Sequence, residues 1–405
     1  MTSSFQTDSF PSWLRLVLGT LTAIIGTNGI WAVIIVLPAV QQEFGVDRSV
    51  ASLPYSTTMI GFAVGNVLAG KAVDRFGLAL PMAVSSVLMS LGYFWASAVE
   101  NIYLFTAIQG IFIGQGAAVF FGPFLADISH YFERYRGIAV AVAASSNYVA
   151  GALWPFFIEP FLSEGSWRDA YFWIGSICSL ILLPMTLYLR QSRNLRESAE
   201  QAKAGYRHHI NSGFSPAQIQ WMLMIAGIGC CVAMSMPQVH IVALCSDFGY
   251  GVAVGTEMLS LMLACGIVSR LGSGLLADRI GGVRTLLIGS CLQCFSLVLY
   301  VQADGLVSLY VVSAVFGLSQ GGIVPSYTLI IREYLPAETA GLRVGALSMA
   351  TISGMALGGW LSGEIYDWTG SYQVALLNGI AWNMMNIMLI GMLWVRPLRI
   401  KSQPV

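Results

Sequence analysis

Charged residues are scarce in this sequence. Only 10% of its 405 residues are Asp, Glu, Lys or Arg, whereas 56% are hydrophobic. Soluble domains carry about 25% charged residues, so this composition excludes an ordinary water-soluble fold. Because the formal net charge is zero, no basic face argues for nucleic acid as a partner. The lack of charge predicts a chain whose main surroundings are the lipid bilayer.

Patterns that carry catalysis or metal binding are also missing. The seven cysteines are odd in number, lie mostly inside apolar runs and show no metal-ligand spacing, so we interpret them as small buried thiols. The sequence has no His/Asp/Cys cluster, nucleophile motif or nucleotide-binding loop, which argues against an enzyme. We therefore expect no catalytic residue, no cofactor and no metal.

Long apolar runs are what the sequence does contain. Runs of about 20 apolar residues, each long enough to cross a hydrocarbon core of roughly 30 Å, recur from one end to the other. The first, Leu16 to Val40, carries no charge and is too long for the core of a signal peptide. Together the runs predict an all-α polytopic membrane protein. The twelve predicted spans are 13–40, 50–70, 80–98, 102–126, 137–159, 167–189, 216–243, 252–276, 283–302, 306–331, 344–365 and 372–395.

The basic residues sort to one side of these spans. With the N-terminus in the cytoplasm, seventeen of the 20 Lys and Arg residues fall in cytoplasmic segments, and the opposite side holds only Arg48 and Arg168. Cytoplasmic loops of membrane proteins are enriched in Lys and Arg, so both termini are predicted to be cytoplasmic. The remaining basic residue, Arg270, lies inside a span.

The chain divides into two related halves. Its longest polar stretch, Leu189 to Pro216, follows the sixth span and suits a water-exposed linker or an amphipathic surface helix. GKAVDRFG (Gly70 to Gly77) and GLLADRIG (Gly274 to Gly281) each follow the second span of a half and share the pattern Gly-x-x-x-Asp-Arg-x-Gly. The predicted organisation is an N-terminal six-helix bundle (1–189), a cytoplasmic linker (190–215) and a C-terminal six-helix bundle (216–405).

The repeated motif resembles the signature loop of the major facilitator superfamily. The resemblance implies two pseudo-symmetric six-helix bundles and a substrate site near the bilayer midplane. An aspartate in such a loop can cap exposed backbone N–H groups or pair with an arginine, so the motifs are candidates for a latch that gates the cytoplasmic face. The alternative is a solvated loop that only directs topology. The candidate gating residues are Asp74, Arg75, Asp278 and Arg279.

A closer resemblance is to the bacterial monocarboxylate and oxalate/formate transporter branch of that superfamily. It is carried by MPQVHIVALCSDFG from Met236, IVSRLGSGLLADRIG from Ile267, HYFERYRGIAVAVAASSN from His130 and GLSQGGIVPSY from Gly317. The resemblance implies that Arg270 binds the substrate carboxylate and that His240 handles substrate or proton. We also expect a monomer in the bacterial cytoplasmic (inner) membrane. The chain departs from the branch in places: Gly266 stands where animal monocarboxylate carriers have an aspartate, and the first span lacks their lysine.

Arg270 is a functional candidate on physical grounds as well. An arginine in the hydrocarbon costs about 2.5–3.5 kcal/mol on insertion scales. Gly266, Ser273 and Gly274 share its helix face and are expected to leave room beside the guanidinium, and no acidic residue lies at a similar depth in any predicted span. Such a guanidinium suits bidentate binding of a carboxylate, and a single deep cation favours a monoanion. The alternative is a side chain that snorkels to the cytoplasmic interface.

The other candidates are less distinctive. His240, near the outer end of its span, is either an interfacial polar residue or a group that binds substrate or takes a proton, because histidine titrates near neutral pH. Polar and aromatic residues on the helices that line the cavity in this superfamily are candidate substrate contacts. Each of them is otherwise a packing or interhelical hydrogen-bonding group. They are Asn28, Trp31, Tyr55, Gln115, Phe121, Asn147 and Gln320.

These observations favour a secondary transporter that moves a small organic anion, predicted to be a monocarboxylate, by alternating access. Proton coupling through His240 is one option. An efflux antiporter for neutral or cationic compounds is an alternative, although it would favour a deep carboxylate, which this sequence lacks. A non-transporting sensor on the same fold is another, although it would normally append a soluble signalling domain.

Overall fold

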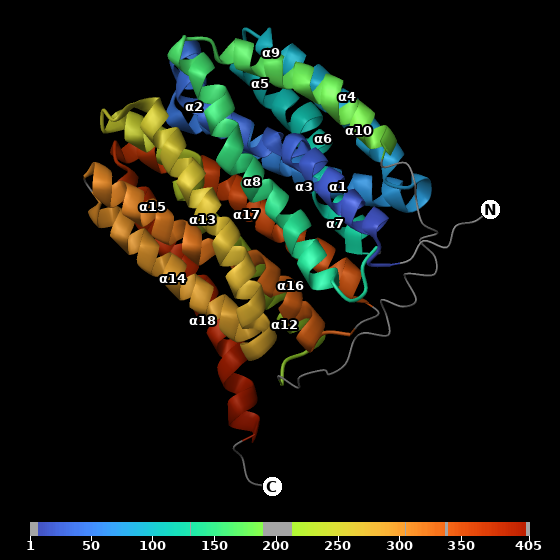
Figure 1. Ribbon diagram of the computed structural model, residues 1–405. Helices are drawn as coiled ribbons and strands as arrows, with labels where there is room; N and C mark the ends of the chain where they lie inside the picture. The colour runs from blue at the N-terminus through green and yellow to red at the C-terminus, as the bar shows by residue number, and fades with distance from the viewer. Residues whose placement is uncertain (1–6, 130, 189–212, 304, 337–338, 402–405) are drawn as a thin grey trace, which may run out of the picture. The chain divides into compact units, whose positions relative to one another are not determined.

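The computed structural model describes residues 7–129, 131–188, 213–303, 305–336 and 339–401 of the chain (Figure 1). Every regular element in these ranges is a helix, so the predicted all-α fold is confirmed. The chain divides into two compact units, one made of Met1–Val46 and Leu53–Gln201 and the other of Asp47–Ser52 and Ala202–Val405. Most of the predicted linker, 190–215, lies outside the described residues.

The helices of the first unit include several that are interrupted within one span. α1 and α2 meet at Thr27. Each of two other spans contains its own π-helical segment, η1 in one and η2 in the other. The elements are α1 (Phe10–Gly26), α2 (Asn28–Phe44), α3 (Arg48–Phe76), α4 (Ala79–Ser97), α5 (Ile102–Ile108), η1 (Gln109–Gly114), α6 (Gln115–Ala118), α7 (Gly122–Ser129), α8 (Arg136–Ser163), α9 (Trp167–Ile177), η2 (Cys178–Leu182) and α10 (Leu183–Tyr188). The first residues of α3, Arg48 to Ser52, belong to the second unit.

The second unit holds the helices that run from yellow-green to red in Figure 1. α12 lies against α13, α17 and α18, and α13 packs against α15. The elements of this unit within the described residues are α12 (Pro216–Asp247), α13 (Gly251–Ile280), α14 (Gly282–Gln302), α15 (Leu306–Gln320), α16 (Ile323–Tyr334), α17 (Ala340–Thr369) and α18 (Tyr372–Lys401).

Eleven segments of the described residues are helical, long and apolar enough to cross a membrane. α1 and α2 together form one of them, Phe10–Phe44, and α15 and α16 form another, Leu306–Tyr334. α3 has 29 residues, which at 1.5 Å per residue exceeds a hydrocarbon core of about 30 Å. Gly, Ser, Thr and charged residues lower its apolar content, so it falls outside the eleven. With α3, the described helices supply twelve spans, as predicted.

A helix break in the second unit positions the candidate site. α15 ends at Gln320, and α16 begins at Ile323 after a turn made by Gly321 and Gly322. Pro325 follows in the first turn of α16. Proline has no backbone N–H, so it cannot bond the carbonyl four residues earlier, which belongs to Gly321. The sequence GGIVP thus removes the N–H that would bond the Gly321 carbonyl if the helix were continuous.

Candidate functional site

Arg270 lies in α13, on the side that meets the break between α15 and α16. Its Nε donates a hydrogen bond to the carbonyl oxygen of Gly321 at 3.3 Å. Pro325, four residues after Gly321, has no N–H to offer that carbonyl. The bond gives a direction to a half-buried guanidinium within the candidate membrane span Gly251–Ile280.

The small residues near this guanidinium serve close packing with the break. A Cβ on Gly321 would lie 2.3 Å from the carbonyl oxygen of Gly266, and a Cβ on Gly322 would lie 2.0 Å from Oγ of Ser273. The prediction that Gly266 and Ser273 leave room beside the guanidinium is therefore wrong, because the backbone of the break fills that face. Gly274 differs, since a Cβ there would meet nothing within 4 Å.

Gln320, the last residue of α15, pairs with a glutamine of α12. Nε2 of Gln238 donates to Oε1 of Gln320 at 2.7 Å, and both side chains are buried. Because Gln320 immediately precedes Gly321, the amide pair and Arg270 meet the same break from different helices. The structure thus brings two predicted residues, Arg270 and Gln320, to one place in the second unit, and adds Gln238 to them.

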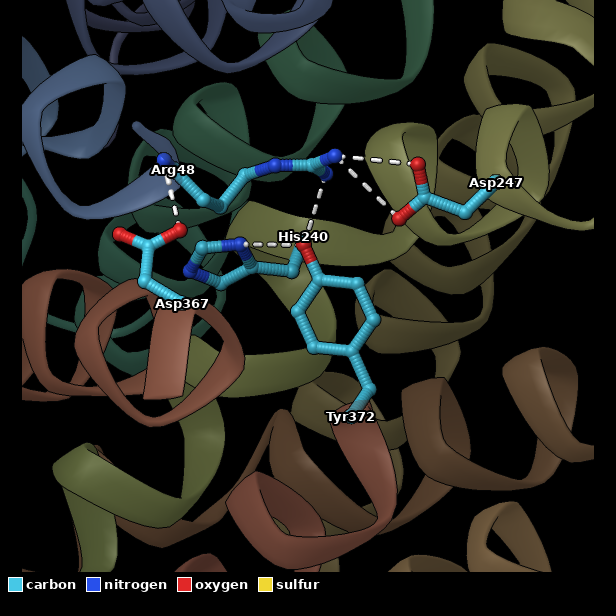
Figure 2. A network of polar contacts seen from close by, with 5 residues as sticks. All are labelled: Arg48, His240, Asp247, Asp367 and Tyr372. Carbon is cyan, nitrogen blue, oxygen red and sulfur yellow. Dashed lines mark hydrogen bonds and ion pairs between the residues drawn. The ribbon is translucent and has the colours of Figure 1, made fainter. Parts of the chain in front are cut away.

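His240 faces a different neighbourhood, the polar cluster shown in Figure 2. It follows Gln238 by two residues, a rotation of about 200° around a helix, and it contacts α17 and α18. Its Nε2 lies 2.8 Å from the carbonyl oxygen of Gly359, and its Nδ1 lies 3.1 Å from the hydroxyl of Tyr372. The ring is fully buried. His240 and Gln238 therefore point to opposite sides of α12.

The contacts of His240 fit a neutral ring. A carbonyl oxygen only accepts, so Nε2 carries the proton that Gly359 receives, and Nδ1 accepts from the Tyr372 hydroxyl. That hydroxyl accepts in turn from Nη1 of Arg48 at 2.8 Å. A second proton on the ring would leave the Tyr372 hydroxyl without its present acceptor. Proton uptake by His240 would therefore require the Tyr372 hydroxyl to turn its proton toward another acceptor.

Arg48 connects the members of this cluster. In Figure 2 its side chain extends over His240 toward Asp247, and its Nη2 lies 3.0 and 3.2 Å from the two carboxylate oxygens of Asp247. The backbone nitrogens of Arg48 and Ser49 donate to the carboxylate of Asp367 at 2.9 and 2.7 Å. Asp367 therefore caps the first turn of α3, where backbone N–H groups lack helical partners and a negative charge is favourable.

Two predicted residues of the first unit contact each other. Nε1 of the buried Trp31 donates to the backbone oxygen and to Oδ1 of Asn147, at 2.9 and 3.0 Å. Asn28 is also buried; its Nδ2 donates to Sγ of Cys178 at 3.7 Å, and its Oδ1 accepts from the Tyr93 hydroxyl. For Asn28 these contacts match the alternative interpretation, an interhelical hydrogen-bonding group.

The remaining candidates of the first unit lie on separate elements. Tyr55 is a buried residue of α3, Gln115 is the half-buried first residue of α6, and Phe121 is half-buried between α6 and α7. The ring of Phe121 lies 6.2 Å from that of Phe62, measured between centroids. Substrate contact by these three residues stays a prediction.

The second copy of the repeated motif leads into α14, whose first N–H groups need acceptors. The carboxylate of Glu333, from α16, accepts from the nitrogen of Gly282 at 3.0 and 3.3 Å. Asp278 and Arg279 are exposed and form no hydrogen bond or ion pair with the residues that the structure describes. The first turn of α14 is thus capped by Glu333, and a gating role for Asp278 and Arg279 stays a prediction.

The first copy of the motif is described only in part. The guanidinium of Arg75 is exposed and lies 5.2 Å from the centroid of the Phe76 ring. The side chain of Asp74 lies outside what the structure describes. Gating by either copy stays a prediction.

Sequence reasoning missed five members of these sites, which are Arg48, Asp247, Asp367, Tyr372 and Gln238. Arg48 carried a signal, since it is one of two basic residues on the non-cytoplasmic side of the predicted topology. Gln238 carried a weaker one, an amide next to Pro237 in a 32-residue helix without a Lys or Arg. Tyr372 carried none, because one tyrosine among 16 is not distinctive. Within the described residues, no group of three or more His, Cys, Asp or Glu side chains could hold a metal ion.

Comparison with known proteins finds one family model and several relatives that are similar to this chain in sequence. The family model described as Major Facilitator Superfamily matches residues 17–301 and 241–404. "Monocarboxylate transporter 13" of Rattus norvegicus is 25% identical over 385 residues, which cover 86% of this chain and 86% of that protein. "Agnestins efflux protein AgnL12" of Paecilomyces divaricatus is 23% identical over 368 residues, which cover 89% of this chain and 81% of that protein.

A solved structure gives a similarity of fold. The proton:xylose symporter XylE bound to 6-bromo-6-deoxy-D-glucose matches with a TM-score of 0.70 over 95% of both chains. The sequence identity is 12%, so this similarity concerns the arrangement of the helices.

Proposed function

Because this chain belongs to the Major Facilitator Superfamily, we propose that it is a secondary transporter that carries a small organic monoanion, a monocarboxylate, across a membrane by alternating access. The observation that carries the proposal is the placement of Arg270 in a membrane span, with its Nε held by the Gly321 carbonyl. In this proposal the two terminal nitrogens of the guanidinium hold the substrate carboxylate.

The physical support comes from charge and geometry. A guanidinium binds a carboxylate through two parallel hydrogen bonds, and such charge-assisted bonds are strong where water is scarce. A cation in the hydrocarbon region is costly and is typically kept for function. An anionic substrate offsets that cost during binding. The rat relative, named a monocarboxylate transporter, supports the same substrate class.

The fungal relative named an efflux protein supports the alternative, export of another small metabolite. The chain is a multi-pass membrane protein. Location in a bacterial inner membrane, cytoplasmic termini and function as a monomer stay predictions, and the relatives named here come from a mammal and a fungus.

Transport by the purified protein tests the proposal directly. In proteoliposomes we expect saturable uptake of at least one labelled monocarboxylate from a panel that also contains oxalate, a neutral sugar and an organic cation. Empty liposomes control for passive entry of protonated acids, which rises as the pH falls. Saturable uptake confined to the neutral or cationic compounds would contradict the proposal.

Proton coupling is expected to depend on His240. Glutamine at this position can still donate to the Gly359 carbonyl and accept from Tyr372, the two contacts of the native ring, but it cannot take up a proton. In His240→Gln we expect downhill uptake and counterflow to persist within about threefold, while the stimulation of uptake by an inward proton gradient disappears. The measurement is uptake with and without an imposed pH gradient.

Tyr372→Phe is the matched variant for this prediction. It keeps the titratable ring and removes the hydroxyl that links His240 to Arg48. We expect the proton stimulation to remain but its pH profile to shift, because the neutral form of the ring loses a hydrogen bond. Full proton stimulation in His240→Gln would exclude His240 as the coupling group.

A further inference from the structure

α3 is one continuous helix, yet its two ends belong to different units. Its first residues, Arg48 to Ser52, belong to the second unit, and the helix from Leu53 onward belongs to the first. Alternating access requires the two units to move against each other. During that movement α3 must either bend near Ser52 or lose its contacts with one of the units. The contacts on each side of this point decide between the two.

The first turn of α3 is held by several independent contacts within the second unit (Figure 2). The Asp367 carboxylate accepts from the backbone nitrogens of Arg48 and Ser49 at 2.9 and 2.7 Å. The buried Arg48 guanidinium donates to Asp247 at 3.0 Å. A Cβ on Gly363 would lie only 2.9 Å from the Arg48 carbonyl oxygen and 3.0 Å from Cα of Ser49. A helix cap, an ion pair and close backbone packing therefore hold this turn on α12 and α17.

From Thr57 onward, α3 is held as closely within the first unit. The Thr57 hydroxyl donates to the carbonyl oxygen of Thr106, in α5, at 2.8 Å. A Cβ on Gly61 would lie 2.0 Å from the carbonyl oxygen of Gly110, in η1, and a Cβ on Gly110 would lie 2.9 Å from the Thr57 carbonyl oxygen. Backbones packed at this distance resist sliding past each other, so this part of α3 moves with the first unit.

Pro54 lies between the two anchored parts of α3. It is buried inside the helix and has no backbone N–H, so it cannot bond the carbonyl of Val50, four residues earlier. Sharp helix kinks occur mostly at proline, and the hinges of moving proteins are a few residues that absorb the change in backbone angles. The turn of α3 that lacks a helical hydrogen bond thus stands where bending is needed.

We propose that α3 bends at Pro54 during transport and that its first turn, Arg48 to Ser52, stays bound to the second unit throughout the cycle. The contacts of Arg48 in Figure 2 are then a fixed anchor. Releasing this turn would separate a buried arginine from its carboxylate partner and uncap two backbone N–H groups. Bending at Pro54 breaks no helical hydrogen bond donated by that residue. The inference rests on the alternating access of the proposed function.

Covalent bridging of the anchor tests the proposal. Arg48→Cys and Asp247→Cys are combined in a background in which the accessible native thiols, Cys265, Cys291 and Cys294, are replaced by alanine. A short bifunctional methanethiosulfonate then joins the two new thiols and takes the place of the ion pair between α3 and α12. In proteoliposomes we expect the bridged protein to keep saturable monocarboxylate uptake at or above the unbridged level. The same reagent on each single-cysteine variant controls for modification alone.

Pro54→Ala tests the hinge without changing the anchor. Alanine supplies a backbone N–H that can bond the Val50 carbonyl and complete the helix. We expect the maximal rates of uptake and counterflow to fall about threefold or more with little change in KM, because the conformational step slows while the substrate contacts remain. Pro155→Ala is the matched control. Pro155 is also buried inside a helix, but this helix, α8, lies wholly in the first unit, so the wild-type rate is expected.

The outcomes separate the hinge from the proposed function. Loss of uptake on bridging that a reductant restores means that the first turn of α3 must come away during transport, and it overturns the inference while monocarboxylate uptake by the wild type leaves the proposed function in place. A wild-type maximal rate in Pro54→Ala also overturns the inference. A wild-type protein that carries only neutral or cationic compounds removes the proposed substrate, and the same variants assayed with the compound carried still test the hinge.

Discussion

Replacing Arg270 with alanine is expected to lower monocarboxylate uptake about a hundredfold or more. Truncating one member of a buried, hydrogen-bonded charge pair costs about 2–5 kcal/mol, and each 1.36 kcal/mol is a factor of ten. Part of the loss arises because the Gly321 carbonyl also loses its donor. Initial rates of uptake into proteoliposomes, at matched protein content, give the measurement.

Arg270→Lys and Pro325→Ala are expected to impair monocarboxylate uptake less than Arg270→Ala does. Lysine keeps the charge but lacks the planar fork, so it is expected to retain a small part of the uptake with a raised KM. Alanine at position 325 restores a backbone N–H that can bond the Gly321 carbonyl, and this N–H competes with Arg270 Nε for it. We expect a severalfold increase in KM with an unchanged maximal rate, because the guanidinium remains but is less well oriented.

Elution and melting in detergent distinguish a binding defect from misfolding in these variants. Each should elute as a single species in detergent and melt within a few degrees of the wild type, because Arg270 is half-buried rather than central to the core. Retention of wild-type uptake by Arg270→Ala would remove Arg270 from the substrate site and would leave snorkelling to the interface as its explanation.

The fold was accessible from the sequence because a bilayer imposes strong rules. Apolar runs of one length, the sorting of Lys and Arg, and the repeated Gly-x-x-x-Asp-Arg-x-Gly pattern are local features that need no knowledge of packing. Hydropathy alone does not identify α3 as a span, because its Gly, Ser and Thr residues lower its mean hydropathy. It is nevertheless a continuous 29-residue helix. Charge asymmetry, rather than hydropathy alone, supported its place among the predicted spans.

The site was accessible only in part because contacts between distant residues decide it. Arg270 could be found as a charge where charge is costly. Its hydrogen bond to Gly321 could not, since it requires knowing that α13 meets the break between α15 and α16. Periodicity can place His240 and Gln238 on different sides of α12, but the partners of each side, Tyr372 and Gln320, come from other helices. Helix faces follow from sequence, whereas their neighbours follow from packing.

The second large effect is expected at Gly321, where alanine should destabilise the protein and impair transport together. The added Cβ would lie 2.3 Å from the carbonyl oxygen of Gly266, 2.7 Å from the nitrogen of Arg270 and 2.9 Å from Cβ of Ser269. Two of these are backbone atoms that cannot turn aside, so the break must move away from α13. Overpacking of this kind costs typically about 1–3 kcal/mol, and the movement also draws the Gly321 carbonyl away from Arg270 Nε.

Gly274→Ala separates this steric effect from any general intolerance of glycine replacement. Gly274 lies on the same helix as Arg270, and a Cβ there meets nothing within 4 Å. Alanine is favoured over glycine in a helix by roughly 0.5–1 kcal/mol, so this variant should melt at or slightly above the wild-type temperature and keep its uptake. Gly321 has a φ of −59°, which alanine adopts without strain, so a loss at this position comes from the approach of α13 alone. If Gly321→Ala melted and transported like the wild type, the close contact that orients Arg270 would be absent from the working protein, and the guanidinium would need another source of orientation.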